Sequence, residues 1–526
     1  MANHLHRNNI QSNHSSKLVG GAAAPHPSFP FARAAIPPRA ATRMAAMLST
    51  VLSAGLLAAS LAGCASAPKE ILHSSAPALL AGVSPEMNSP GFWIAAHPAP
   101  DAPVLDAAGI ERLNNRTRET GLIRDLSLPI KKTGEELAKD FQGTIDWISK
   151  ARIYQSNGKR VSASFMEPIA AQMNSGSIPA IVVPRSGFLA ERVNCRVLPT
   201  NEGLFDEPGD VYIDNLQASS LEPGTAAIVL HTSTDGAWLY IVTELISGWI
   251  PASSFAEADL ETFLARYRSA NQLAVVAARA DLWDDENNTV YAGYLRMGSS
   301  LLSLPDGEEN GGAYRRASLP GRSPDGVYIE RIVRLRAEDV TEGVLPYTPR
   351  HIYEQAFKLL HAPYGWGGLF GERDCSQFLC EVFSTVGIVL PRNSSKQAQT
   401  GTALVGFTKD ADPEAKKDLL AAGALPGATL LRLPGHIMLY LGTANGEPMV
   451  IHSTWAYREP RGRKEIIRLV NRTVVSSLRP GSGTKKGSHL ERLTTAAMLV
   501  EPEPAAIPAI PAIPERPISP DNSSQP

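Results

Sequence analysis

Hydrophobic and polar positions divide the chain into stretches of different periodicity. Residues 100–175 carry apolar side chains at three- and four-residue steps, the spacing that gathers them on one face of a helix. Thr133, followed three residues later by Glu136, predicts the start of one helix through a capping box, and Gly158 predicts its end. Residues 178–345 change to short apolar runs broken by Gly, Pro, Asp and Asn. We therefore expect a helical region followed by β-structure.

The β-rich stretch contains a clear hairpin pattern. Residues 226–251 predict a strand, an Asp235-Gly236 turn, a second strand and a short return strand. Together with "LEPGT" before it and "GWI" at its end, this segment resembles bacterial SH3 domains. A second run of strands, up to residue 336, resembles another small barrel with a Gly-rich insertion at 306–326. We interpret Trp238 and Trp249 as core residues of the first barrel.

Two cysteines lie five positions apart in "DCSQFLCEVFSTVG" and differ in their setting. The apolar spacing after Cys375 predicts a helix that begins at this residue and stops at Gly387. The partial positive charge of a helix N-terminus favours a thiolate, which makes Cys375 the candidate nucleophile. Cys380 falls inside the helix, where a free cysteine usually behaves as a small hydrophobic residue.

A cysteine nucleophile needs a base, and two histidines follow in "GHIMLYLGTANGEPMVIHSTW". His436 opens an alternating strand, Asn445-Gly446 marks a turn and His452 ends the return strand. A simple two-residue hairpin would place the two histidines on opposite faces of the sheet. We therefore predict a wider loop or one bulge, which returns them to a shared face. Zinc is the alternative use of Cys and His, but these spacings fit no compact zinc motif, and we expect no metal and no cofactor.

The N-terminal segment predicts export. Residues 44–64 are apolar and rich in small residues, with arginines before them, as in a secretory signal. The ending "LAGC" resembles the bacterial lipobox, which implies lipidation of Cys64 and a membrane anchor. We expect the bacterial cell envelope, on the periplasmic side. The net charge of −2 gives no support for nucleic-acid binding.

Four blocks in order resemble the NlpC/P60 cysteine peptidases: "PYGWGG", "DCSQFLCEVFSTVGIVLPRNSSKQAQTG", "GHIMLYLG" and "VIHSTW". The resemblance implies a papain-like α+β catalytic domain that cuts the γ-D-glutamyl–diamino acid bond of cell-wall stem peptides or muropeptides. It further implies that Cys375 is the nucleophile, His436 the general base and His452 the orienting residue. For the substrate it implies Asp374 and Ser376, which would hold a free N-terminal L-Ala amine, together with Tyr364. We also expect Trp366 to bind substrate, and Arg392 to pair with a substrate carboxylate.

These patterns give a multidomain α+β chain with two SH3-like barrels before the catalytic domain. The expected order is a leader and signal (1–64), a tether (65–90), a helical region (91–175), SH3-like domains (176–260 and 261–346), the catalytic domain (347–485) and a Pro-rich tail (486–526). Two other functions stay open. One is a wall-binding scaffold whose catalytic domain is idle, and the other is Cys-His amidase or acyltransferase chemistry.

Overall fold

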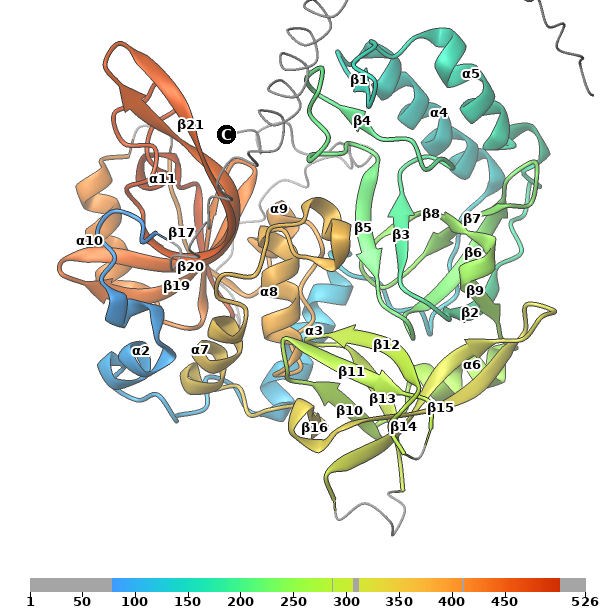
Figure 1. Ribbon diagram of the computed structural model, residues 1–526, viewed down its shortest axis with the longest axis horizontal. Coiled ribbons are helices and arrows are strands. Elements are labelled where there is room, and N and C mark those ends of the chain that lie inside the picture. The colour runs from blue at the N-terminus through green and yellow to red at the C-terminus, as the bar shows by residue number, and fades with distance from the viewer. Residues whose placement is uncertain (1–77, 286, 306–311, 409–410, 502–526) are drawn as a thin grey trace, which may run out of the picture. The chain divides into compact units, whose positions relative to one another are not determined.

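The structure is a computed structural model that describes residues 78–285, 287–305, 312–408 and 411–501 (Figure 1). These residues form a mixed helix and sheet structure in which the strands make three large sheets and one two-stranded sheet. The signal segment, Cys64, half of the tether and the end of the Pro-rich tail lie outside the described residues. Within the described residues, every helix is too short or too polar to cross a membrane.

The N-terminal helices begin where the sequence predicts, but one ends earlier. Thr133 and Glu136 form the predicted capping box at the start of α4. This helix ends at Lys150 rather than near Gly158, because Ala151 is extended and β1 then pairs with β4. The elements of this part are α2 (Pro90–Ala96), α3 (Ala107–Glu119), α4 (Gly134–Lys150), β1 (Tyr154–Gln155), α5 (Ala163–Gln172) and β4 (Leu204–Phe205).

The helical region does not pack as one unit. Trp93 of α2 and Leu113 of α3 belong to the same core as the C-terminal helices. Leu137 and Phe141 of α4 instead belong to the core of the first large sheet. The expected region 91–175 is therefore divided between two cores, a division that helical periodicity alone does not reveal.

The first large sheet has the order β5-β3-β8-β7-β6-β2-β9. The predicted Asp235-Gly236 turn joins β6 to β7, with Gly236 at φ 72°. Trp249 is fully buried and Trp238 packs half-buried against the same core, as expected. Its strands are β2 (Arg185–Leu189), β3 (Val193–Arg196), β5 (Gln217–Leu221), β6 (Ala226–Thr232), β7 (Trp238–Val242), β8 (Ser247–Pro251) and β9 (Phe255–Glu257), followed by α6 (Leu260–Tyr267).

The second large sheet has the order β12-β11-β15-β14-β13-β10-β16 and its own apolar core. The stretch predicted as a Gly-rich insertion is only partly a loop, because it contains β14, which pairs along its full length with β15. The strands are β10 (Gln272–Val275), β11 (Arg279–Trp283), β12 (Tyr291–Arg296), β13 (Ser300–Leu304), β14 (Tyr314–Arg322), β15 (Tyr328–Arg336) and β16 (Val340–Glu342).

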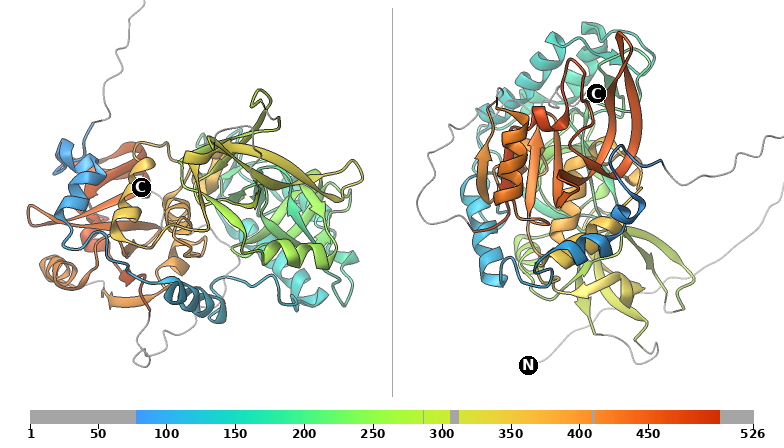
Figure 2. Two further views of the ribbon diagram at one scale, coloured as in Figure 1. Left: turned by 90° about the horizontal axis from the view of Figure 1, so that it is seen from below. Right: turned by 90° about the vertical axis from the view of Figure 1, so that its left-hand side faces the viewer.

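The C-terminal sheet has the order β17-β22-β18-β19-β20-β21, and helix α8 lies against β19 and β20 (Figures 1 and 2). Apolar residues of α8 share a core with Ile437 and Ile451. On the other face, residues of α10 and α11 share a core with Met438 and Tyr440. Its elements are α7 (Pro349–Lys358), α8 (Cys375–Ser384), α9 (Ser394–Gln397), β17 (Thr402–Gly406), α10 (Pro413–Gly423), β18 (Thr429–Leu433), β19 (His436–Ala444), β20 (Glu447–Arg461), β21 (Lys464–Ser477), α11 (His489–Arg492) and β22 (Thr495–Met498).

The C-terminal sheet extends past the expected boundary at residue 485. Strand β22 lies between β17 and β18, and α11 precedes it. Residues 486–498 therefore belong to the fold of the C-terminal sheet and not to a tail. The short runs "HLER" and "TAAM" are too brief for their periodicity to predict an element.

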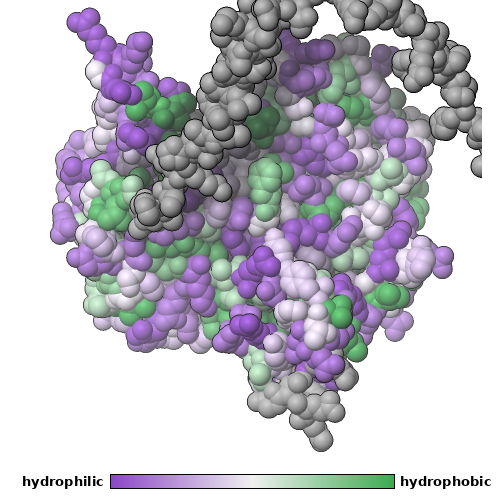
Figure 3. Space-filling view, in the orientation of Figure 1, coloured by the Kyte–Doolittle hydropathy of each residue, from purple (hydrophilic) through white to green (hydrophobic). Residues whose placement is uncertain are grey.

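Strands β20 and β21 form a long hairpin whose far end is hydrophilic (Figure 3). Arg461, Arg463 and Lys464 at this end are exposed. The base of the same hairpin carries His452, so one element reaches from the candidate site to the solvent.

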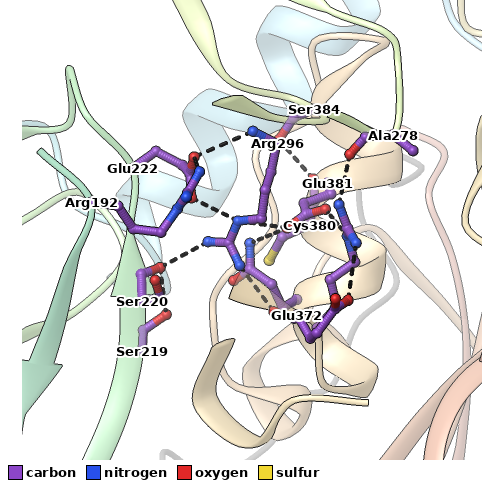
Figure 4. A network of polar contacts seen from close by, with 12 residues as sticks. Arg192, Ser219, Ser220, Glu222, Ala278, Arg296, Glu372, Cys380, Glu381 and Ser384 are labelled. Atoms are coloured by element: carbon purple, nitrogen blue, oxygen red, sulfur yellow. Dashed lines mark hydrogen bonds and ion pairs between the residues drawn. The ribbon is translucent and has the colours of Figure 1, made fainter. Parts of the chain in front are cut away.

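Buried ion pairs connect the first two large sheets to helix α8 (Figure 4). Arg296 of β12 contacts Glu222, next to β5, at 2.7 Å and Glu381 of α8 at 3.5 Å. Arg373 also pairs with Glu381, and Arg192 pairs with Glu222 at 2.7 Å. Because a buried charge is costly without its partner, this network fixes the first and second large sheets against the helix that begins at Cys375.

Candidate active site

Cys375 is the first residue of α8, as predicted. Asp374 caps this helix by accepting hydrogen bonds from the backbone N–H groups of Ser376 and Gln377. The Cys375 thiol is buried and accepts a hydrogen bond from the backbone N–H of Ile437, the residue after His436. The helix start and the beginning of β19 therefore bring the thiol to the histidine strand.

A bulge places the two histidines on one face of the sheet, as the parity of their spacing predicts. Near the Asn445-Gly446 turn, β19 and β20 pair in the two-residue register. The register shifts between Tyr440 and Gly442, so the pairs closer to the site follow a different register. Nε2 of His436 then lies 2.7 Å from Nδ1 of His452.

The hydrogen-bond chain continues to a residue that the sequence analysis missed. Nε2 of His452 lies 2.9 Å from the hydroxyl of Ser476 on β21, and both side chains are buried. If Ser476 accepts from Nε2–H of His452, then Nδ1 of His452 accepts from Nε2–H of His436. This tautomer leaves Nδ1 of His436 free to take a proton, which a general base requires.

Burial sets the charge state of this site. It raises the pKa of the Cys375 thiol to about 12, and the nearby Asp374 carboxylate acts in the same direction. Burial and the positive charge of Arg492 lower the pKa of His436 to about 3. The thiolate that the helix N-terminus predicts is therefore not the favoured resting state, because desolvation outweighs the helix N-terminus. A neutral thiol beside a neutral imidazole is favoured.

Arg392 is buried and does not project toward solvent as an exposed loop arginine would. Its guanidinium donates to both carboxylate oxygens of Asp374, at 3.1 and 2.5 Å, and to the Ser376 hydroxyl at 2.7 Å. A fourth bond, of 2.8 Å, reaches the Ser219 hydroxyl on β5. These bonds use four of its five N–H groups, so Arg392 stabilises the helix cap instead of being available for the expected substrate carboxylate.

The segment that contains Tyr364 and Trp366 contacts the first large sheet. Nε1 of Trp366 donates to the carbonyl of Asp214 at 2.9 Å. Tyr364 is half-buried, and its ring lies 6.1 Å from that of Trp455. Trp455 in turn lies 5.0 Å from the ring of Tyr212, in the loop before β5. Of the expected substrate residues, Tyr364 thus lies along an aromatic row, and Trp366 holds its own segment against the loop before β5.

The paired glycines in this segment serve the same contact. Gly367 and Gly368 have φ of 56° and 79°, and a Cβ on either would meet Gln217 or Ser220 of β5 at less than 3 Å. Gln217 also donates to the Gly367 carbonyl at 3.0 Å. The backbone whose close approach these glycines permit is therefore that of β5.

Two further side chains belong to the neighbourhood of the site or its core. Cys380 is buried in the core beneath α8, as predicted. His489, the first residue of α11, is buried beside His436 and His452. The capping-box pattern Ser488-x-x-Glu491 is the signal that predicts its helix, but no spacing connects it to Cys375. Among the described residues, no group of three or more His, Cys, Asp or Glu is arranged to hold a metal ion.

Comparisons with known proteins identify two family domains in the chain. Residues 204–251 match the SH3 domain family of the SH3b1 type, and residues 361–464 match the NlpC/P60 family. The comparison with curated proteins found no match. A solved NlpC/P60 endopeptidase from Photobacterium damselae subsp. piscicida is 23% identical, with a TM-score of 0.65, over 78% of this chain and 97% of its own. An NlpC/P60 family protein from Bacillus cereus is 18% identical, with a TM-score of 0.36, over 54% of this chain and 83% of its own. The chain therefore contains an SH3 domain and an NlpC/P60 family domain, and it shares the fold of a solved NlpC/P60 endopeptidase.

Proposed function

We propose that the chain is a cysteine endopeptidase that cleaves the γ-D-glutamyl–diamino acid bond of cell-wall stem peptides. The observation that carries the proposal is the 2.7 Å contact between Nε2 of His436 and Nδ1 of His452, beside the thiol at the start of α8. A base oriented by a second polar group, next to a cysteine at a helix N-terminus, is the arrangement that thiol acyl transfer requires.

Acylation begins with a proton transfer. As the Cys375 sulfur attacks the amide carbonyl, Nδ1 of His436 takes the thiol proton. Asp374 occupies the N–H groups of Ser376 and Gln377, so we assign the Cys375 N–H to the developing oxyanion. His436 then gives the proton to the leaving amine, the C–N bond breaks, and a thioester with the γ-carboxyl carbon of D-Glu remains.

Deacylation reverses the proton path. His436 takes a proton from water as the water oxygen attacks the thioester, and the sulfur leaves with that proton. The products are a peptide that ends in D-Glu and a peptide that begins with the diamino acid. The bond from His452 to His436 keeps the same nitrogen of His436 facing the reaction in both halves.

We also propose that the enzyme acts in the bacterial envelope, anchored through Cys64, and prefers stems with a free N-terminal L-Ala. Asp374 and Ser376 lie beside the nucleophile, where such an amine would be bound. Arg392 already neutralises the Asp374 carboxylate. The comparison of the free and acetylated peptides below therefore tests the amine preference most strictly.

The test is product analysis by mass spectrometry. The full chain is incubated with L-Ala-γ-D-Glu-diaminopimelate, with its N-acetylated form and with the isomer linked through the α-carboxyl of D-Glu. We expect cleavage after γ-D-Glu, slower cleavage of the acetylated peptide and none of the α-linked isomer. Equal rates for the free and acetylated peptides would remove the amine preference. Cleavage at another bond, or no cleavage of any peptide, would contradict the proposed endopeptidase.

A further inference from the structure

A third histidine completes a cluster around the general base. The ring of His489 lies 5.9 Å from that of His436, at an angle of 42°, and 5.8 Å from that of His452, at 82°. Its side chain is buried, and its Nδ1 has no hydrogen-bond partner. The contacts of its ring with His436 and His452 are therefore the interactions that this side chain makes with the cluster.

Helix α11, which carries His489, is fixed at both of its ends. At its start, Ser488 and Glu491 form a capping box. At its end, the ammonium of the fully buried Lys416 donates to the carbonyls of Glu491 at 2.7 Å and of Leu490 and Leu493 at 3.3 Å. A buried lysine that binds three carbonyls of one short segment holds that segment in a single position.

The same helix is also bound to the turn that precedes the base. Arg492 donates to the carbonyl of Pro434 at 3.2 Å, two residues before His436. The backbone of His489 itself donates to the carbonyl of Pro480 at 2.9 Å. The His489 ring is thus held against His436 from a helix that is anchored to the strand bearing His436.

We propose that His489 is a positioning residue, whose ring confines His436 to the orientation that bonds His452 and excludes water from that bond. Its effect on turnover rests on the proposed function, whereas its effect on His436 does not. An imidazole that can rotate loses the geometry on which proton transfer depends.

The charges around the cluster support a neutral His489. Burial lowers its pKa well below the usual 6.5, and His436 and Arg492 act in the same direction. The pKa of His452 is lowered by burial, by His436 and by His489. For His436, burial and Arg492 lower the pKa and only Asp374 raises it. If water enters beside His436, the effect of burial weakens and the pKa of His436 rises.

The test compares His489→Ala and His489→Phe in the full chain. Histidine-selective NMR, with signals assigned through His436→Gln and His452→Gln, follows the titration of His436 without substrate. We expect His436 to titrate about one pH unit or more higher in His489→Ala, because burial is its largest effect. The kcat should fall about tenfold while KM stays within about twofold, since the loss is one of orientation. His489→Phe keeps a ring and should resemble the parent in both measurements.

Each outcome either supports or overturns the positioning role of His489. An unchanged His436 titration in His489→Ala would overturn the proposal, as would a His489→Phe variant as impaired as His489→Ala. If His489→Ala does not fold, the phenylalanine variant still tests the claim, since the ring role predicts parental values. If no peptide is cleaved but His436 still shifts, the proposed function fails and the role of His489 remains.

Discussion

Nε2 of His436 and Nδ1 of His452 are 2.7 Å apart, although the turn between their strands would by itself place them on opposite faces. The bulge near Gly442 changes the register and turns both imidazoles to the same side. The site therefore depends on an irregularity in the hairpin as much as on the histidines.

Replacing His452 should show whether this residue orients His436 or contributes to substrate binding. In His452→Leu the proton chain to Ser476 is lost and His436 can adopt either tautomer. We expect kcat to fall by about 10²-fold or more with a small change in KM. His231, a buried histidine of the first sheet bonded to the Met173 carbonyl, provides the control. His231→Leu should keep the parental kcat per folded molecule, and a similar loss in both variants would contradict the orienting role.

As the pH is lowered, activity should be lost only at a pH well below the usual pKa of histidine. His436 must be neutral to accept the thiol proton, and its pKa is lowered to about 3. Activity is then retained as the pH falls through 6.5 and is lost only as the pH approaches the lowered pKa. Measurement of kcat/KM between pH 4 and 8 checks this. An inflection at about 6.5 would mean that His436 is solvated in the working enzyme.

Loss of Arg392 should destabilise the chain through Asp374. In Arg392→Met the buried Asp374 carboxylate loses its cation, which costs about 3–5 kcal/mol in comparable buried pairs. Asp374→Asn with Arg392→Met should recover much of the loss, because asparagine also caps helices. Urea unfolding measures both variants, with Arg463→Met at the exposed hairpin end as control. A double variant no more stable than the single one would argue against the charge explanation.

The pKa of Asp374 gives this pair a pH dependence of known sign. Arg392 and the capping N–H groups hold this pKa below its usual value despite burial. The stabilisation is therefore present at neutral pH and disappears as the pH falls through the lowered pKa. In acid, the stabilities of the parent and of the double variant should converge.

The buried ion pairs in Figure 4 should make the first two large sheets unfold together with α8. Arg296→Met leaves Glu222 and Glu381 without their shared arginine, and we expect a loss of about 3–5 kcal/mol. The first sheet should then unfold before α8, and two transitions should replace one in urea. Arg336→Met, at an exposed pair with Glu338 in the second sheet, is the control. A single transition at the parental midpoint would show that other contacts hold the sheets together.

The sequence predicts those parts of the site that depend on local pattern. Asp374 and the apolar spacing after Cys375 determine where α8 begins, and the even spacing of the two histidines requires the bulge. The burial of Arg392 and the approach of β5 to Gly367 depend on packing between separate sheets. No local pattern contains that information, which is why the sequence indicated a substrate-binding role for Arg392 instead.

The same reasoning explains why His489 escapes sequence analysis. It lies in a four-residue helix beyond the expected domain boundary, and only the pairing of β22 brings that segment back into the sheet. A long-range strand pairing of this kind leaves no periodic trace in so short a segment.

The central claim, that Cys375 is the nucleophile, is tested most directly by comparing its loss with the loss of Cys380 in the same helix. Cys375→Ala and Cys380→Ala are compared for cleavage of L-Ala-γ-D-Glu-diaminopimelate, with unfolding midpoints measured alongside. Cys375 faces the histidine strand and Cys380 packs in the core, so we expect cleavage to vanish in the first variant. The second should retain the parental rate within a few-fold while losing some stability. Cleavage by Cys375→Ala at the parental rate would contradict the account.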